Sequence, residues 1–168
     1  LITPFLLFAE SALRTSGLEW TVLRNSLYAD PIIDWVPDIV EMGTIPYPTG
    51  AGRCAYVSRE DIARAGAAAV TGDGHEGRVY KLTGPAALST TELCEAVSRV
   101  TGKVVVDKDA KDADYIEACR LGDEPERMIF LLLSLYHAVR DGHLSLVSDD
   151  IEKLTGRRPT SFFELLKR

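Results

Sequence analysis

Short runs of β-branched and aromatic residues alternate with helical patterns through the first half of the chain. Of all features of the sequence, this alternation restricts the possible folds most strongly. Residues 20–23, 54–57 and 78–82 form such runs, and we expect each of them to be a β-strand. Between them lie apolar residues at helical spacing over 29–42 and an alanine-rich helical stretch that ends near Val70. Strands separated by helices are typical of an α/β sheet whose faces are covered by helices.

Helices dominate the second half of the chain. The pattern predicts helices over residues 113–121 and 125–140, short helices near Asp149 and Ser161, and one more strand over residues 103–106. We therefore expect an α/β sheet segment with an appended helical lobe.

Local signals define where several helices begin or break. Ser58, Ser89 and Ser161 each precede an acidic residue three positions later, which is the pattern of a capping box. Asp61 completes the first of these boxes, so we interpret it as structural rather than catalytic. Pro37 should kink or split the helix in which it lies, because proline removes a backbone donor.

The composition excludes several classes of partner and site. A net charge of -6 argues against a nucleic-acid partner, because phosphate contacts need a basic surface. Cys54, Cys94 and Cys119 form no CxxC pair, so we expect no metal site and reduced thiols in a cytoplasmic protein. The longest apolar run, residues 128–139, is shorter than the roughly 20 residues that span a bilayer, so we expect no membrane partner. The chain begins with Leu1 rather than methionine, which hints at a fragment or a processed product.

Two glycine-rich stretches match the residue pattern of a dinucleotide-binding loop but not its position between a strand and a helix. Residues 72–77 read GxGxxG and residues 50–55 read GxGxxA. A phosphate-binding loop follows a strand and opens a helix, so that free N–H groups at the helix start meet the pyrophosphate. The first stretch follows a helix and the second leads into a strand, so we interpret both as turns.

Residues 10–25, E-S-A-L-R-T-S-G-L-E-W-T-V-L-R-N, resemble the NmrA-like branch of the extended short-chain dehydrogenases, most of all its bacterial NAD(P)H:quinone oxidoreductase-like members. The resemblance continues through residues 55–63, A-Y-V-S-R-E-D-I-A, and 74–84, G-H-E-G-R-V-Y-K-L-T-G. Residues 88–95 and 155–159 are also similar to family segments, so the resemblance covers nearly the whole chain.

The resemblance implies an α/β fold that is the C-terminal part of a Rossmann-type (NAD(P)-binding) fold with a small, mostly helical substrate lobe. The glycine-rich loop of the family has no counterpart in the chain. We assign residues 1–84 to the C-terminal part of the Rossmann-like sheet, with 29–52 contributing to the substrate lobe. Residues 85–168 are then the small helical lobe on the substrate side.

The loop after the strand at 20–23 is the predicted cofactor-binding segment. Ligands of open α/β sheets bind beyond the carboxyl ends of the strands, and the resemblance places Arg24, Asn25 and Ser26 beside the nicotinamide. The Asn25 amide can both donate to and accept from a carboxamide or a ribose. Alternatively, Asn25 only turns the chain.

Three tyrosines are the predicted substrate-binding residues. Tyr28 offers an aromatic face with a hydroxyl at its tip, which suits a flat substrate. Tyr47 and Tyr56 are further candidates for the wall of the cleft. The alternatives are that Tyr28 fills the lobe interface and that Tyr56 is a core residue of its strand.

The resemblance implies part of an NAD(P)H-dependent oxidoreductase acting on quinone-like or small carbonyl substrates, with NADP or NAD as cofactor of the complete protein. Hydride transfer is the chemistry of the cofactor, so no catalytic residue is assigned. The alternative is a non-catalytic, redox-sensing or regulatory binding protein. We expect a small-molecule ligand, leave a homodimer open, and expect the chain alone to be inactive because it lacks the phosphate loop.

Overall fold

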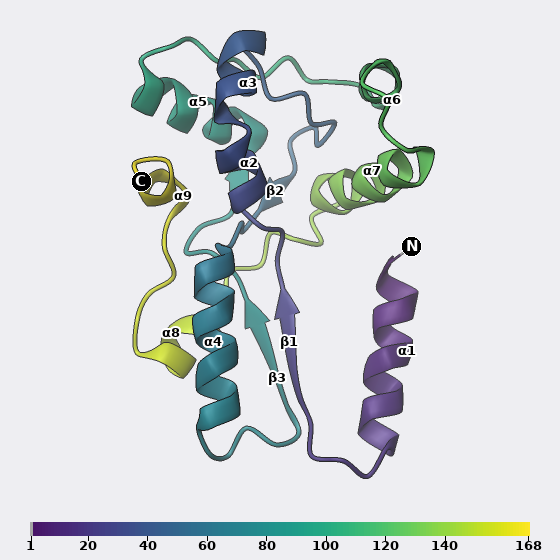
Figure 1. Ribbon diagram of the computed structural model, residues 1–168, viewed down its shortest axis with the longest axis vertical. Helices are drawn as coiled ribbons and strands as arrows, with labels where there is room; N and C mark the ends of the chain where they lie inside the picture. Colours follow the sequence, from purple (N-terminus) through teal and green to yellow (C-terminus); the bar gives the residue numbers. More distant parts are fainter. Residues whose placement is uncertain (1) are drawn as a thin grey trace.

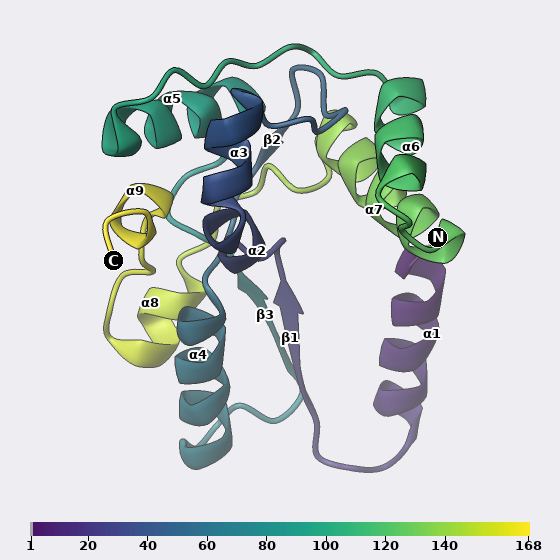
Figure 2. The same cartoon turned by 45° about the horizontal axis from the view of Figure 1, so that its top comes forward.

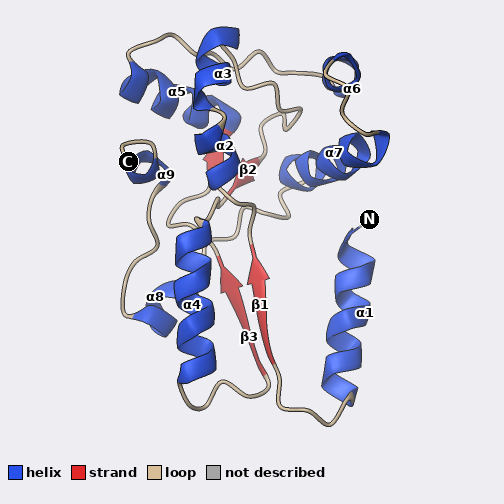
Figure 3. Ribbon diagram, viewed as in Figure 1, coloured by secondary structure: helices blue, strands red, loops and turns tan. Residues whose placement is uncertain are grey.

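The computed structural model describes residues 2–168, and Figure 1 shows a small parallel sheet beneath a group of helices. Figure 3 distinguishes the helices from the strands. The helices are α1 (Ile2–Thr15), α2 (Asp30–Asp34), α3 (Val36–Met42), α4 (Arg59–Thr71), α5 (Thr90–Thr101), α6 (Asp112–Leu121), α7 (Glu126–Arg140), α8 (Asp150–Thr155) and α9 (Phe162–Leu165). The strands are β1 (Thr21–Asn25), β2 (Arg53–Cys54), β3 (Arg78–Leu82) and β4 (Leu88–Ser89).

The strands β1 and β3 form a parallel pair, in register from Thr21 opposite Arg78 to Asn25 opposite Leu82. Parallel strands need a crossover connection, which here contains α4. The carboxyl ends of both strands point toward the helices of the lobe (Figure 1). β2 and β4 form a separate antiparallel pair. The predicted alternation of strands and helices is therefore present.

Helices cover the two sides of the sheet unequally. α4 packs against β1, and α8 packs against both β3 and α4. α1 lies on the other side of β1 and stands apart from it in both orientations of the molecule (Figures 1 and 2). Its apolar side chains Leu7 and Phe8 are exposed. The division of the chain at residue 84 stays our proposal. Helix α8 lies beyond residue 84 in the sequence, yet it packs on the sheet.

Buried apolar side chains form two separate cores. The sheet core consists of Val57, Ala65, Leu82 and Ile151 and lies between the strands, α4 and α8. The lobe core lies among the helices above the sheet. It contains Ala29, Ile32, Ile39, Ile45, Tyr47, Cys54, Tyr56, Leu93, Cys94, Val97, Val105, Tyr115, Ile129, Leu133, Tyr136, Val139, Phe162 and Leu165.

The proline signal correctly predicted a broken helix. The helical pattern over residues 29–42 forms two helices, α2 and α3, which meet at Trp35. Pro37 lies in the first turn of α3, where a missing backbone N–H leaves no hydrogen bond unmade. The left-handed Gly43 then ends α3.

The strand predicted over residues 103–106 is wrong. The Val105 N–H donates to the Ser98 hydroxyl of α5, and the Val106 N–H donates to the Gly43 carbonyl. These partners satisfy the backbone without a neighbouring strand, so the β-branched run forms an irregular segment that packs on the lobe. The short strand β4 and the start of helix α1 at Ile2 were not predicted.

The serine caps are present with one difference. Ser89 and Ser161 form complete capping boxes with Glu92 and Glu164. The Ser58 hydroxyl accepts from the Asp61 N–H, but the buried Asp61 carboxylate accepts from the Ser58 hydroxyl and from a distant backbone N–H. Asp61 is thus a structural residue, as predicted, and it links α4 to the C-terminal segment.

Candidate functional site

A cavity of about 450 Å³ lies at the carboxyl end of β1, where the sheet meets the lobe. Its walls come from α1, the end of β1, α2, α7 and the loops between them. Its volume falls within the range of roughly 300–1,000 Å³ that is usual for small-ligand sites. The lining residues are Leu6, Asn25, Ser26, Leu27, Tyr28, Pro31, Ile32, Tyr47, Tyr56, Leu132, Leu135 and Tyr136.

Backbone hydrogen bonds hold the loop that follows β1 in one conformation. The Ser26 N–H donates to the Leu82 carbonyl at 2.9 Å, which continues the β1–β3 ladder by one residue. Val57 bonds the same loop on both sides: its N–H donates to Leu27 at 3.0 Å and its carbonyl accepts from Ala29 at 2.9 Å. The side chains that follow β1 therefore stand on a rigid support at the mouth of the cavity.

Asn25, the last residue of β1, and Tyr28, in the loop that follows, are exposed polar residues at this end of the strand. The Asn25 amide donates to the Tyr28 hydroxyl over a long 3.4 Å contact, and both side chains reach solvent. The amide oxygen and one amide hydrogen thus stay available to a ligand. The Arg59 guanidinium lies 5.9 Å from the centre of the Tyr28 ring.

Ser26 lies deeper than Asn25 and faces a cysteine. The hydroxyl of the buried Ser26 is 3.6 Å from the Cys54 sulfur. Burial raises the pKa of the Cys54 thiol to about 11, so the sulfur stays protonated near neutral pH. Cys54 is therefore not a thiolate nucleophile, and it packs as a small apolar residue.

Stacked aromatic rings form the wall of the cavity on the lobe side. The rings of Tyr47 and Tyr136 are stacked with their centres 4.6 Å apart, and Trp35 lies 6.2 Å beyond Tyr47. Tyr115 contacts Tyr136 edge-on at 5.3 Å. Burial raises the pKa of Tyr47 to about 12 and also raises the pKa of Tyr136, so both phenols are neutral hydrogen-bonding groups.

Tyr56 lines the cavity from the segment after β2. Its side chain is almost fully buried and belongs to the lobe core, and burial raises the pKa of its phenol well above the ordinary value. Both readings of Tyr56, as a wall of the cleft and as a core residue, thus describe the same position.

The structure brings five of the predicted site residues to one cavity: Asn25, Ser26, Tyr28, Tyr47 and Tyr56. Arg24 is not among the lining residues. It is held by Glu10 of α1, with Nε and Nη2 at 2.7 and 2.6 Å from the two carboxylate oxygens. Successive side chains of a strand point to opposite faces, so Arg24 and Asn25 cannot serve the same side of β1.

Sequence reasoning did not name the residues of α7 that contribute to this site. Leu132, Leu135 and Tyr136 line the cavity, whereas Leu133 of the same helix belongs to the lobe core. The apolar run at 128–139 was visible in the sequence, but helical periodicity does not say which of two buried faces meets a ligand. No periodic signal marked Leu6 of α1 either.

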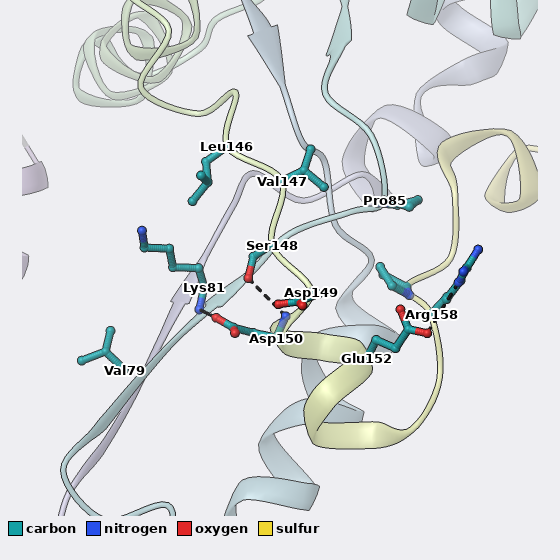
Figure 4. A pocket seen from close by; sticks show the side chains of 11 residues that line it. Val79, Lys81, Pro85, Leu146, Val147, Ser148, Asp149, Asp150, Glu152 and Arg158 are labelled. Atoms are coloured by element: carbon teal, nitrogen blue, oxygen red, sulfur yellow. Dashed lines mark hydrogen bonds and ion pairs between the residues drawn. The ribbon is translucent and has the colours of Figure 1, made fainter.

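A second cavity, of about 660 Å³, lies beside the outer edge of β3 (Figure 4). Its polar groups bond to one another: the Asp150 carboxylate accepts from the Lys81 N–H at 2.7 Å, and Glu152 pairs with Arg158 at 3.5 Å. We assign it no ligand. In the part of the chain that the structure describes, no group of three or more His, Cys, Asp or Glu side chains could hold a metal ion.

The described helices include none with both the length and the apolar character needed to cross a membrane. Residues 72–77 connect α4 to β3, and residues 50–55 lead into β2. Both glycine-rich stretches are therefore turns without a following helix start, as predicted.

Comparisons with known proteins agree with this arrangement. No family model matches the chain. Quinone oxidoreductase 2 of Escherichia coli is 30% identical over 155 residues, which are 92% of this chain and 54% of that protein. An NmrA-like family domain-containing oxidoreductase of Aspergillus flavus is 26% identical over 159 residues, 91% of this chain and 50% of that protein.

Solved structures extend the similarity to the fold. The triphenylmethane reductase of a Citrobacter species, complexed with NADP(H), superposes with a TM-score of 0.89 at 31% identity and covers 96% of this chain and 57% of that chain. The chain thus spans about half the length of the curated relatives it matches. By these matches in sequence and structure, the chain has a partial Rossmann-type fold, and its homologues are NmrA-like and NAD(P)H quinone oxidoreductase-type proteins.

Proposed function

We propose that this chain supplies the substrate side of an NAD(P)H-dependent oxidoreductase that acts on quinone-like or small carbonyl compounds. The observation that carries the proposal is the cavity at the carboxyl end of β1, which gathers the exposed amide of Asn25 and an aromatic wall within one space of suitable size. That edge of an α/β sheet is where ligands of such folds bind. The matched relatives, a quinone oxidoreductase and a triphenylmethane reductase complexed with NADP(H), support the same class.

We propose Asn25 and Ser26 as contacts for the nicotinamide end of NADP or NAD. The Asn25 amide is exposed and has a donor and an acceptor for a carboxamide. The cofactor contact predicted for Arg24 also stays a proposal, although in the described structure its guanidinium pairs with Glu10 of α1. When bound, the nicotinamide supplies a hydride, and the residues of this chain orient the acceptor toward it.

The described residues fit only this end of the cofactor. A pyrophosphate needs a helix start directly after a strand, but β1 leads into α2, a helix of five residues, through a loop without glycine. We therefore propose that the phosphates are held by residues other than those described, in the complete protein. This chain on its own is then expected to bind the cofactor weakly and to be inactive.

We propose Tyr28, Tyr47 and Tyr56 as the substrate contacts. Their rings and the leucines of α7 offer apolar area to a flat molecule, and their hydroxyls can donate to a carbonyl oxygen. The substrate oxygen would accept a hydrogen bond from such a hydroxyl as electron density builds up on the carbonyl or quinone during reduction.

A non-catalytic, redox-sensing protein is the second candidate. It is favoured by one observation: the lining of the cavity includes no His, Asp, Glu or Lys among the described residues, so phenols are the strongest acids available. A sensor needs only to bind the nucleotide, whereas reduction of a carbonyl also needs a proton.

We also propose a cytoplasmic location and a homodimer. The cysteines of the chain are free thiols, which fits a reducing compartment. Phe130 and Leu131 of α7 are exposed apolar residues that a second copy could cover.

The test measures NADPH-dependent quinone reduction and NADPH binding by the natural protein. Asn25→Ala is expected to lower kcat/KM about tenfold, the loss of one well-placed hydrogen bond. The control Arg78→Ala changes an exposed residue at the opposite end of the sheet and should leave kcat/KM unchanged. NADPH binding without turnover would favour the sensor, and the absence of NADPH binding would refute the proposal.

A further inference from the structure

A cation lies beside the cavity at the carboxyl end of β1, although none belongs to its lining among the described residues. The guanidinium of Arg59, in the first turn of α4, lies 5.9 Å from the centre of the Tyr28 ring, and Tyr28 lines the cavity. A guanidinium over an aromatic face is held by cation–π attraction. Both side chains are exposed, so the cation lies where the wall of the cavity meets solvent.

Backbone contacts fix Arg59 relative to this wall. Tyr28 and Val57 form an isolated parallel bridge, and Ser58 then caps α4 directly before Arg59. The Arg59 N–H donates to the Asp30 carboxylate at 2.9 Å, which ties the start of α4 to the start of α2. The base of the Arg59 side chain is therefore held in place, while its guanidinium reaches the Tyr28 ring.

The Arg59 guanidinium keeps its hydrogen-bonding capacity for a ligand. In the described part of the chain, no carboxylate lies within ion-pair distance of it, and the Asp30 carboxylate accepts from the backbone of Arg59. Arg24, on the strand that leads into the same loop, is by contrast paired with Glu10. Since the planar fork of a guanidinium matches two oxygens of a carboxylate or phosphate group, Arg59 is ready to bind an anion.

The interior of the cavity directs a charged substituent to this place. Its lining among the described residues contains apolar, hydroxyl and amide side chains and no ionised group, so an anion inside it would lose water without gaining a charged partner. Beside Arg59 the same anion stays partly solvated and gains a charge-assisted hydrogen bond. A flat acceptor with one acidic substituent therefore fits with its ring against Tyr28 and its anion at Arg59.

We propose that Arg59 binds an anionic substituent of the acceptor, such as a carboxylate, sulfonate or phosphate group, and so favours acidic acceptors over neutral ones with the same ring system. This inference rests on the proposed function, because it takes the cavity as the substrate site. It adds a charge preference that the quinone-like ring and the carbonyl group do not contain.

The test compares two acceptors that share a ring system and differ in charge, anthraquinone sulfonate and hydroxymethyl-anthraquinone. NADPH-dependent reduction of each by the natural protein gives a selectivity ratio, which is kcat/KM for the sulfonate divided by kcat/KM for the neutral compound. Arg59→Gln removes the charge and should lower this ratio about fivefold. The effect is moderate because Arg59 is exposed and the Asp30 carboxylate lies nearby. The loss should fall on KM, because a contact remote from the reacting carbonyl binds substrate and transition state equally.

Matched variants separate charge from other effects of the substitution. Arg59→Lys keeps the charge and should retain most of the ratio, whereas Arg59→Glu should lower it further. Arg78→Gln changes an exposed arginine at the amino end of β3 and should leave the ratio unchanged. High salt should lower the ratio of the unmodified protein toward that of Arg59→Gln, because ions screen an exposed pair.

A phosphate of the cofactor is the other anion that could reach Arg59. In that case Arg59→Gln would weaken NADPH binding, measured by isothermal titration, and would leave the ratio for the two quinones unchanged. We expect the opposite result, a lower ratio with an NADPH dissociation constant close to that of the unmodified protein. Weaker NADPH binding with an unchanged ratio would overturn the inference.

The outcomes also separate this inference from the function on which it rests. An unchanged ratio in Arg59→Gln, or an equal fall in Arg78→Gln, would overturn the role of Arg59 while the cavity stays the substrate site. If the natural protein reduces neither quinone, the proposed function itself is wrong. Titration of anthraquinone sulfonate into the NADP complex then still tests Arg59: weaker binding by Arg59→Gln supports the anion site without turnover, and equal binding overturns it.

Discussion

The lobe core and the sheet core differ in how they are stabilised. The lobe core joins residues from α2, α3, α5, α6, α7 and α9. Some of these residues also line the cavity. The sheet core contains four buried apolar residues, and polar ties supplement it, such as Asp61 to Thr160 and Asp150 to Lys81. In the described part of the chain, β1 pairs with β3 alone. The lobe is thus stabilised mainly by buried apolar packing, whereas the sheet side also relies on individual hydrogen bonds.

The largest expected effect is on the lobe core. Leu93→Ala removes a fully buried side chain of α5 and should lower the free energy of unfolding by about 2–5 kcal/mol. Leu18→Ala, at a position 68% exposed, should change it by less than about 0.5 kcal/mol. Urea denaturation followed by circular dichroism measures both. Equal effects of the two substitutions would contradict the assignment of the lobe core as the main source of stability.

The junction between the two regions should be sensitive to a single added methyl group. A Cβ at Gly84 would lie 1.9 Å from the Tyr56 carbonyl oxygen, so Gly84→Ala should destabilise the protein by about 1–3 kcal/mol. The same substitution at Gly66 meets only Leu23 at 3.7 Å and should stabilise α4 by about 0.5–1 kcal/mol. Thermal melts of the two variants should shift in opposite directions, and a shared direction would argue against this close approach.

The sheet side should respond to the loss of one carboxylate. The fully buried Asp61 accepts from the Ser58 hydroxyl at 2.7 Å and from the Thr160 N–H at 2.8 Å, and it also pairs with Arg64. Asp61→Asn removes the charge and one acceptor, at an expected cost of about 1–3 kcal/mol. Glu60→Gln, in the same turn but exposed, is the matched control. Hydrogen exchange should show faster opening of α4 and of the segment around Thr160, with the helices of the lobe core unchanged.

The smallest expected effect concerns the tie between α1 and β1. The hydrogen bonds from Arg24 hold the pKa of Glu10 below its ordinary value of 4.5. A carboxyl whose pKa is lowered on folding stabilises the protein above its unfolded pKa, and this contribution is lost as the pH falls through the folded pKa. Glu10→Gln should therefore cost less than about 1 kcal/mol at neutral pH and nothing in acid. Urea melts at both pH values test this, with Glu76→Gln as control, and a difference that persists in acid would contradict the assignment.

Local signals in the sequence predicted most of the helices and the end of β1. The break at Pro37 and the caps at Ser89 and Ser161 depend only on neighbouring residues, and they were predicted correctly. The segment at 103–106 was predicted wrongly. Its backbone N–H groups bond to Ser98 and Gly43, which do not belong to a neighbouring strand, and the β-branched residues of the segment give no sign of these partners.

The candidate site was predictable in part for the same reason. Asn25 and Tyr28 lie at and just beyond the carboxyl end of β1, which can be predicted from the sequence, and they line the cavity. Arg24 is adjacent to Asn25 in the sequence but points to α1, because side chains alternate along a strand. Tyr136 could not be assigned, since a helix with apolar residues on most of its faces gives no sign of which face meets a ligand.

The sequence by itself determined most of the helices, the parallel strands β1 and β3, the capping boxes at Ser89 and Ser161 and the family to which the chain is similar, because these depend on short-range propensities and on linked motifs. Only the tertiary structure decided that α7 and α1 close the cavity opposite Asn25, that Arg24 faces away from it, and that Asp61 joins α4 to Thr160. Such contacts join residues far apart in the chain, and they are set by packing and by the partners left for each buried polar group, which no local pattern contains.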